Sequence, residues 1–368
     1  MDQEYTFSFG GVLSCIRIRS GLPSIDNITA FYKHSGAIAA VCDTHTEPIA
    51  RQILGGKDAP LCALPPGEAA KTWHSAEAVL ETAKNAGLGR DGLFIGVGGG
   101  VISDITAFAA SVYMRGAGLC LISTSLLGMA DAAVGGKTGF NLFGAKNFAG
   151  TFYPASLIYM PAASLASLPK QEWQSGMAEI IKTAVLDTSD ETERFWSALA
   201  ALPGKAEPPR DILVECIARS VRLKGRIVEA DPRETGEERI LLNLGHTFGH
   251  ALEATAGLGQ LSHGEAVAWG IVQACTLGRI LGITPAERAE RITALIRSFG
   301  YETRTPHPLA PDTAEFLRAL QNDKKKKAGA VRFIVPAQTG AVAVSGEKID
   351  PRLLTRILSG EEGYSCVS

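Results

Sequence analysis

Apolar and polar positions follow two different patterns along the chain, and the change falls near residue 165. In the first part, short apolar runs alternate with helix-spaced segments and turns. Strands separated by helices favour a parallel sheet covered on both faces. The pattern predicts strands over 5–19 (paired about a turn at Gly10-Gly11), 37–42, 92–97, 119–122 and 156–160, and a helix over 75–86.

From Leu168 onward the apolar spacing is that of long helices. We place the domain boundary between Ala163 and Pro169, which gives an α/β domain over 1–165 and a mostly α-helical domain over 166–368. The predicted C-terminal elements are helices over 171–186, 191–202, 211–229, 265–281, 286–299 and 310–323, a helix that carries His246 and His250, a hairpin over 330–344 about Gly340, and a last helix from Pro351.

Composition limits the classes of function. At 368 residues and 46% hydrophobic the chain is long enough for more than one core. A net charge of −2 gives no overall attraction to nucleic acid or membrane, so an anionic ligand must be held by local lysines and arginines. The first residues lack a signal-peptide pattern, no long apolar run predicts a membrane span, and seven cysteines are scattered. We therefore expect a cytoplasmic protein with reduced thiols.

Three of the seven histidines fall within eighteen residues. His246 and His250 are four apart in a helical pattern and so project from one face, and His263 stands at the head of the next apolar helix. Imidazole is the commonest neutral metal ligand, and a catalytic zinc typically takes three protein ligands. One such histidine alone is more often a helix-cap or core residue. The three together, beside N-x-x-H and H-G-E, favour a metal site.

A glycine-rich turn is the main motif of the α/β part. The segment 98–104, G-G-G-V-I-S-D, follows an apolar strand and opens a predicted helix over 105–113, a context that binds pyrophosphate. Ser103 stands where the dinucleotide fingerprint has glycine or alanine, and a ribose-binding acid about 20 residues later is missing. Asp43, at the end of an earlier strand, could take that role or could cap a helix. The turn alone leaves both interpretations open.

Two further segments carry charged groups in unusual settings. The segment 129–150 is punctuated by glycines and predicts a loop system, where lysines can hold a phosphate or carboxylate, although a single loop lysine is usually only solvated. Its polar residues are Asp131, Lys137, Asn141, Lys146 and Asn147. In the apolar run 176–186, Glu179 and Lys182 share one helix face. A buried carboxylate needs partners, and a metal ion would serve Glu179.

Taken together, the motifs resemble the 3-dehydroquinate synthase family of sugar phosphate cyclases, in the family's order from Asp43 to Lys325. The resemblance rests on G-G-G-V-I-S-D, T-S-L-L-G-M-A-D-A-A-V-G-G-K-T-G-F-N, G-A-K-N, G-M-A-E-I-I-K, N-L-G-H-T-F-G-H-A-L-E and S-H-G-E-A-V-A. It implies a Rossmann-like N-terminal α/β domain, a mostly helical C-terminal domain, and a homodimer. It also implies NAD, one Zn²⁺ or Co²⁺ ion, and conversion of 3-deoxy-D-arabino-heptulosonate 7-phosphate to 3-dehydroquinate and phosphate in the shikimate pathway.

The resemblance also assigns roles to individual positions. The implied metal ligands are Glu179, His246 and His263. The implied catalytic residues are His250, Lys182, Asp131, Lys137 and Glu234. The implied substrate-binding residues are Arg115, Lys137, Lys146, Asn147, Lys182, Lys224, Arg239, Asn243, His250, Lys324 and Lys325. The implied NAD-binding residues are Asp43, Glu68, Lys71, Gly99, Gly100, Val101, Asp104, Thr124, Ser125, Asp131, Lys137 and Lys146.

The sequence departs from the family pattern at Ser103, at 123–125, where S-T-S replaces P-T-T, and by one extra residue before Arg239. Three alternatives stay open: a sister cyclase like 2-epi-5-epi-valiolone or 2-deoxy-scyllo-inosose synthase, a non-catalytic NAD- and metal-binding homologue, and an iron-dependent polyol dehydrogenase. Lys224 and Asn243, with Arg239, favour a substrate that bears a carboxylate. The complete ligand set and the many lysines argue against the other two.

Overall fold

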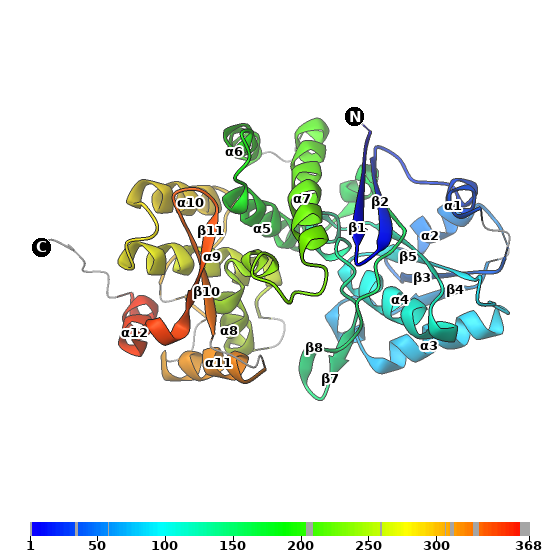
Figure 1. The fold of residues 1–368 in the computed structure, drawn as a ribbon. Helices are drawn as coiled ribbons and strands as arrows, with labels where there is room; N and C mark the ends of the chain where they lie inside the picture. The colour runs from blue at the N-terminus through cyan, green and yellow to red at the C-terminus, as the bar shows by residue number, and fades with distance from the viewer. Residues whose placement is uncertain are drawn as a thin grey trace, which may run out of the picture. The chain divides into compact units, whose positions relative to one another are not determined.

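The computed structural model divides the chain into two compact units (Figure 1). Unit 1 comprises Met1–Gly176 and Leu213–Arg233, and unit 2 comprises Met177–Ile212 and Glu234–Ser368. The structure describes residues 2–33, 36–57, 59–203, 209–257, 260–305, 307–309, 313–326 and 331–360, with the backbone alone at 321–326. Below, each unit is described by itself.

Unit 1 is built on a seven-stranded sheet in the order β1-β2-β9-β6-β5-β3-β4. The β1–β2 pair is antiparallel and turns at Gly10-Gly11, both with positive φ, whereas the other neighbours are parallel. The strands predicted from the apolar runs are all found. Their bounds are β1 Gln3–Phe9, β2 Val12–Arg19, β3 Ile38–Asp43, β4 Leu61–Leu64, β5 Leu93–Gly98, β6 Gly118–Ser123 and β9 Leu157–Pro161.

Helices follow the parallel strands, as the alternating pattern predicted. They are α1 Ile25–Tyr32, α2 Glu47–Leu54, α3 Trp73–Asn85 and α4 Gly100–Val112, with short helices η1 Glu68–Ala70, η2 Tyr113–Arg115, η3 Gly128–Ala132 and η4 Ala162–Ser167. Strand residues such as Ile95, Val97 and Ile122 are buried in the core. The helix α7, Arg210–Ala230, joins this unit from Leu213, and Gly225 leaves room there for the ring of Phe7.

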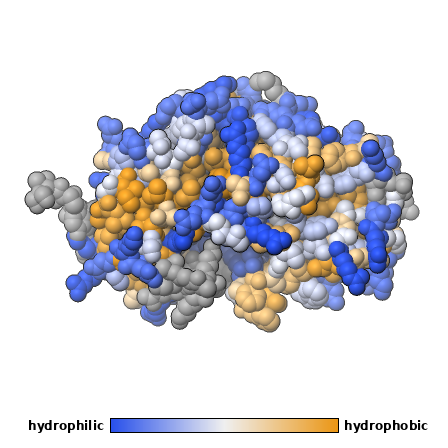
Figure 2. Space-filling model, viewed as in Figure 1, coloured by the Kyte–Doolittle hydropathy of each residue, from blue (hydrophilic) through white to orange (hydrophobic). Residues whose placement is uncertain are grey.

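The segment 129–150, predicted as loops, is more ordered than the sequence indicated. It contains an antiparallel hairpin of β7 Phe140–Leu142 and β8 Ala145–Ala149, which turns at Phe143-Gly144. Both turn residues have positive φ, a conformation that sequence reasoning expects of Asn-Gly or Asp-Gly rather than of phenylalanine. Phe143 and Phe148 pack edge to face at 5.9 Å and are 85% and 62% exposed. Figure 2 shows the hairpin as a pale orange projection.

Unit 2 is mostly helical, and its helices follow the predicted ranges closely. They are α5 Lys170–Leu186 (from Met177 in this unit), α6 Thr192–Ala200, α8 His246–Ala256, α9 His263–Ile280, α10 Ala286–Ser298, α11 Thr313–Lys326 and α12 Pro351–Ser359, with η5 Arg239–Asn243 and η6 Gly346–Lys348. The predicted hairpin is β10 Arg332–Pro336 and β11 Ala341–Ser345. The hydrophobic core of unit 2 includes Trp269, Phe248 and Phe316. In the part of the chain that the structure describes, we find no helix with the length and apolar character that crossing a membrane requires.

Glycines let α8 and α9 cross at backbone contact. A Cβ atom on Gly270 would lie 2.0 Å from the carbonyl oxygen of Gly245, and one on Gly249 would lie 2.8 Å from that of Ala266. Gly245 also has φ +80° where it precedes the first residue of α8, a conformation that L side chains rarely adopt. Because the two helices approach so closely, the histidines at their first residues come together: the rings of His246 and His263 are 5.3 Å apart.

Candidate metal centre and glycine-rich turn

Three helices of unit 2 each present one candidate metal ligand. Glu179 lies in the part of α5 that belongs to unit 2, and its side chain is 1% exposed. His246 is the first residue of α8, and His263 is the first residue of α9. The start of α9 is fixed by a capping box in which the side chains of Ser262 and Glu265 each bond the other's backbone N–H. His263 therefore stands on a capped helix end.

The three side chains converge on one point. Oε1 of Glu179 lies 3.5 Å from Nε2 of His246 and 3.5 Å from Nε2 of His263. The donor atoms of this set all lie within 4.8 Å of one another. Two ligand atoms bound about 2.1 Å from one tetrahedral ion are about 3.4 Å apart. One carboxylate and two imidazoles at this spacing are therefore a suitable donor set for one divalent transition metal with open positions for substrate oxygens.

The second nitrogen of each imidazole has its own partner. Nδ1 of His246 lies 3.2 Å from the carbonyl oxygen of Leu244, and Nδ1 of His263 lies 3.6 Å from Oε2 of Glu253. In the neutral ring, a hydrogen bond donated by Nδ1–H to such a partner favours the tautomer that leaves the Nε2 lone pair for a metal ion. Glu253 was not among the residues predicted from the sequence, because its place beside His263 depends on the crossing of α8 and α9.

Charge is concentrated around Glu179. Lys182, one turn along α5 and 3% exposed, contacts its carboxylate, so the pair predicted from the sequence is buried as expected. Burial, with the positive charge of Lys182 beside it, lowers the pKa of His246 to about 3. Burial alone would also lower the pKa of His263, but Glu179 and Glu253 accept from its ring and raise that pKa to about 10. The site thus favours a positive charge between the two carboxylates.

In unit 1, the glycine-rich turn joins β5 to α4 as predicted. Gly99 is the N-cap of α4, and the backbone N–H of Thr124 donates to Gly98 at 2.9 Å. A Cβ atom on Gly99 would lie 3.0 Å from Oγ of Ser125, and one on Gly100 would lie 3.2 Å from Cβ of Ala132. The head of the helix, with Gly99, Gly100 and Val101, is therefore held close to Thr124 and Ser125, and its amides and dipole can bind an anion such as pyrophosphate.

Asp43 ends β3, as the sequence indicated, and its Oδ1 accepts from the backbone N–H groups of His45 and Thr46. These bonds form a turn just before α2, whose N-cap is Thr46, so they fix the loop after β3 and do not make Asp43 the helix cap. A carboxylate accepts more bonds than these two, so a role in holding a ribose is compatible with them.

Lys71 is the centre of a polar network in unit 1. Its Nζ lies 2.5 Å from Oδ2 of Asp104 and 2.5 Å from Oδ1 of Asn147. Asn141 donates to Oε1 of Glu68 at 2.8 Å and accepts from the backbone N–H of Asn147. The network therefore ties the hairpin β7–β8 to the segment 66–71, which holds Glu68 and Lys71, and to α4. Asn141, one of the polar residues of the segment 129–150, completes the network.

The other candidates in unit 1 are placed as follows. Lys224 of α7 pairs with Asp131, its Nζ lying 2.9 Å from Oδ1 and 2.7 Å from the backbone oxygen. The structure places Lys137, Lys146 and Arg115 at the surface. Arg115 also has φ +75° in the short helix η2. Exposure by itself shows no preference of these side chains for an anionic ligand.

The remaining candidates of unit 2 differ in burial. Arg239 is buried at 2% exposure in η5, which also holds Asn243. His250 is exposed one turn beyond His246 on α8, with the two rings 5.3 Å apart. Glu234 has φ +57°, an uncommon conformation for a residue with a Cβ atom. Lys324 and Lys325 lie in α11, but their side chains fall outside the described part of the chain.

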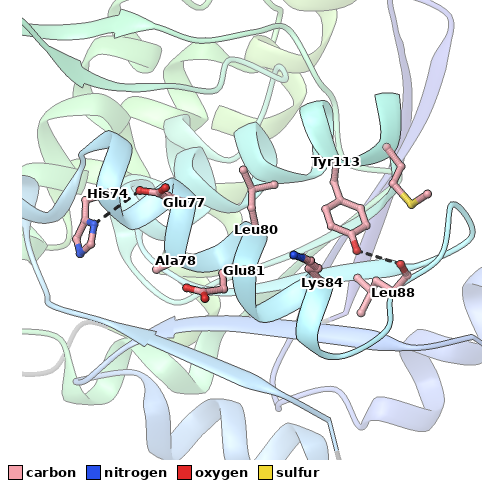
Figure 3. Close-up of a pocket in the computed structure, with 9 residues that line it drawn as sticks. His74, Glu77, Ala78, Leu80, Glu81, Lys84, Leu88 and Tyr113 are labelled. Atoms are coloured by element: carbon pink, nitrogen blue, oxygen red, sulfur yellow. Dashed lines mark hydrogen bonds and ion pairs between the residues drawn. The ribbon is translucent and has the colours of Figure 1, made fainter.

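A surface groove of about 730 Å³ in unit 1 includes none of these residues. It is lined by α3 and the segment after α4, and its residues are His74, Glu77, Ala78, Leu80, Glu81, Lys84, Leu88, Tyr113 and Met114 (Figure 3). Its polar contacts are local: His74 pairs with Glu77 at 4.0 Å, and Tyr113 donates to the backbone of Leu88. His74 and Glu77 are 93% and 62% exposed, so the groove offers no buried polar group to fix a ligand.

Comparison with known proteins places the chain in a family. Residues 61–175 match the family model 3-dehydroquinate synthase N-terminal, and residues 176–326 match 3-dehydroquinate synthase C-terminal. The chain is 38% identical over 338 residues to the 3-dehydroquinate synthase of Acidithiobacillus ferrooxidans. The aligned region covers 90% of this chain and 91% of that protein. The chain belongs to the 3-dehydroquinate synthase family. The family predicted from the sequence motifs is thereby confirmed.

Solved structures show the same fold. A 2-deoxy-scyllo-inosose synthase in complex with carbaglucose-6-phosphate, NAD⁺ and Co²⁺ matches with a TM-score of 0.81 at 21% identity, over 97% of this chain and 99% of that one. The 2-epi-5-epi-valiolone synthase of Streptomyces hygroscopicus with NAD⁺ and Zn²⁺ matches with a TM-score of 0.76 at 24% identity, over 93% and 95%. The predicted fold class, Rossmann-like α/β followed by a mostly helical domain, is confirmed for this member of the 3-dehydroquinate synthase family.

Proposed function

We propose that the protein catalyses the reaction for which its family is named, the conversion of 3-deoxy-D-arabino-heptulosonate 7-phosphate to 3-dehydroquinate and inorganic phosphate. The observation that carries the proposal is the convergence of Glu179, His246 and His263 in a chain whose relative at 38% identity is a 3-dehydroquinate synthase. A carboxylate and two imidazoles suit a single Zn²⁺ or Co²⁺ ion. The fold neighbours, solved with NAD⁺ and a divalent metal, are compatible with both cofactors.

When bound, NAD supplies a reversible hydride acceptor and the divalent ion supplies a Lewis acid that favours ionised substrate hydroxyls. In unit 2, Glu179, His246 and His263 would hold the ion. His250, exposed beside them, would face the substrate and exchange protons with it. The buried cations Lys182 and Arg239 would bind anionic oxygens of the substrate, together with Asn243, Lys324 and Lys325, while Glu234 would orient the cations.

In unit 1, the proposed NAD ligands are grouped around the glycine-rich turn. The amides at Gly99, Gly100 and Val101 would bind the pyrophosphate, and Thr124 and Ser125 lie against the same turn. Asp43 and Glu68 would hold ribose hydroxyls, whereas the ion pair of the buried Lys71 with the partly buried Asp104 would contact the nicotinamide side. Lys224, held by Asp131, would bind the substrate, as would Arg115, Lys137, Lys146 and Asn147.

One assay separates this reaction from those of the sister cyclases. Protein loaded with NAD and zinc is incubated with the seven-carbon keto acid phosphate, with sedoheptulose 7-phosphate, and with glucose 6-phosphate, and inorganic phosphate is measured. We expect release from the keto acid alone, because Lys224, Arg239 and Asn243 suit a carboxylate. Phosphate release from either sugar phosphate that lacks a carboxylate would instead assign the protein a sister activity. Phosphate release from none of the three would favour a non-catalytic homologue.

We also propose that the protein acts in the cytoplasm as a homodimer. The location is supported by the six described cysteines, which are buried free thiols. The dimer follows the family resemblance, and sedimentation equilibrium of the NAD-loaded protein tests it: a mass of about one chain at micromolar concentration would contradict it.

A further inference from the structure

Glu253 lies on the same face of α8 as the two histidines of that helix. It follows His246 by seven residues and His250 by three, spacings that place side chains on one face. Its side chain is 12% exposed, and its Oε2 lies 3.6 Å from Nδ1 of His263, on the facing helix α9. A partly buried carboxylate is therefore aimed at the ring nitrogen that the proposed metal centre does not use.

The carboxylate of Glu253 can either bind a metal ion itself or hold the ring of His263 from behind. These two roles exclude each other. Glu253, His250 and His263 form a second possible donor set, which shares His263 with the set around Glu179. A neutral imidazole has one lone pair, so His263 can serve only one set at a time. Its Nε2 faces Glu179, and that set contains the more buried residues, whereas His250 in the other set is exposed. The geometry favours the set around Glu179.

We propose that Glu253 is a positioning residue for the metal ligand His263. Its carboxylate, 3.6 Å from Nδ1, would accept a hydrogen bond from Nδ1–H in the metal-bound protein, fix the tautomer with the lone pair on Nε2, and hold the ring toward Glu179. Among the described residues, the corresponding partner of His246 is the neutral backbone carbonyl of Leu244. The two imidazoles are thus unequal: His263 is backed by a negative charge and is the stronger donor. This inference rests on the metal site of the proposed function.

The test measures metal affinity and not turnover. Metal-free protein is titrated with Co²⁺ in competition with a chelator, and the visible absorption of bound Co²⁺ is recorded. Loss of such an outer partner typically weakens metal binding about 10- to 100-fold. We expect Glu253→Ala to fall in this range and Glu253→Gln, which keeps an acceptor oxygen, to lose less. The matched control is Thr255→Ala on the same helix, whose hydroxyl bonds only the backbone of Ala251 and Leu252 in the described contacts, and we expect no change there.

Three further measurements make the result decisive. Thermal unfolding with chelator present should show a cooperative transition for Glu253→Gln, so that a loss of Co²⁺ affinity reflects the site and not a failure to fold. Unchanged Co²⁺ affinity in both Glu253 variants would overturn the proposal, as would two Co²⁺ ions per chain with one lost in Glu253→Gln, because Glu253 would then be a ligand. His263→Ala tests the metal site itself: if it keeps full affinity, the proposed site fails and not merely the role of Glu253.

Discussion

The ammonium group of Lys182 contacts the carboxylate of Glu179 one turn away on α5, and both side chains are almost fully buried. An isolated buried charge is strongly unfavourable, so each group depends on the other. If a metal ion binds there, it takes the place of the proton on Nε2 of His263 and brings a larger compensating charge to the same carboxylate. Lys182 therefore affects the metal-free and metal-bound protein differently.

We expect Lys182→Met to destabilise the chelated protein by about 3–5 kcal/mol, the usual cost of removing one partner of a buried ion pair. The loss should be smaller with saturating zinc, because the ion then compensates Glu179. Urea unfolding with chelator and with zinc measures both values. An equal loss under the two conditions would show that the ion does not bind at Glu179. Lys170→Met on the same helix, at an exposed position, serves as the control.

His263 and His250 should separate metal binding from turnover. His263→Ala removes one of three proposed ligands, so we expect metal content after dialysis to fall at least tenfold while unit 1 stays folded. His250→Ala should keep its metal and lose about 10²- to 10⁴-fold in kcat, the range typical of a general acid or base. Atomic absorption and steady-state rates measure these effects. Loss of metal in the His250 variant would make that residue a ligand.

The contact between α8 and α9 should tolerate no side chain at Gly270. A methyl group there would meet the carbonyl oxygen of Gly245 at 2.0 Å, so the helices must separate. We expect Gly270→Ala to cost at least about 1–3 kcal/mol in unfolding free energy, as overpacking usually does, and to weaken Co²⁺ binding because His246 and His263 move apart. Gly21→Ala is the control, since a Cβ atom there meets nothing within 4 Å. Equal stability of the two variants would refute the close contact.

The pair of Lys71 and Asp104 predicts a dependence on pH. Burial raises the pKa of Asp104 above its usual value even though Lys71 counteracts this effect. In Lys71→Met the counteracting charge is lost, so the pKa in the folded state should rise further. A carboxyl group with a raised folded pKa binds its proton more tightly when folded, so stability falls as pH rises through that pKa.

We therefore expect Lys71→Met to lose more stability relative to wild type at pH 8 than at pH 5, measured by urea unfolding at both values. Adding Asp104→Asn should restore part of the loss at pH 8, because the buried charge is then absent. A loss of stability that is the same at both pH values would mean that Asp104 does not titrate in this range. The affinity for NAD, measured by calorimetry, should fall in the single variant.

The elements were largely predictable because their signals are local. Helices α5, α9 and α10 follow the apolar spacing to within a few residues, and the turn at Gly10-Gly11 lies where the sequence put it. The hairpin β7–β8 was missed because its strands are short and its turn uses Phe143 at positive φ. The sequence pattern changes near Ala163–Pro169, a few residues before the first compact unit ends at Gly176. Unit 1 also includes residues 213–233, which comprise most of α7 and the turn after it.

The amino-acid sequence by itself determined the family, the order of the elements and the identity of the metal-ligand candidates, because motifs and periodicity are properties of neighbours along the chain. Only the tertiary structure decided which nitrogen of each histidine faces Glu179 and that Glu253 stands behind His263. Those relations depend on the distance at which α8 and α9 cross. That distance is set by the absence of side chains at Gly245, Gly249 and Gly270, whose partners lie far away in sequence.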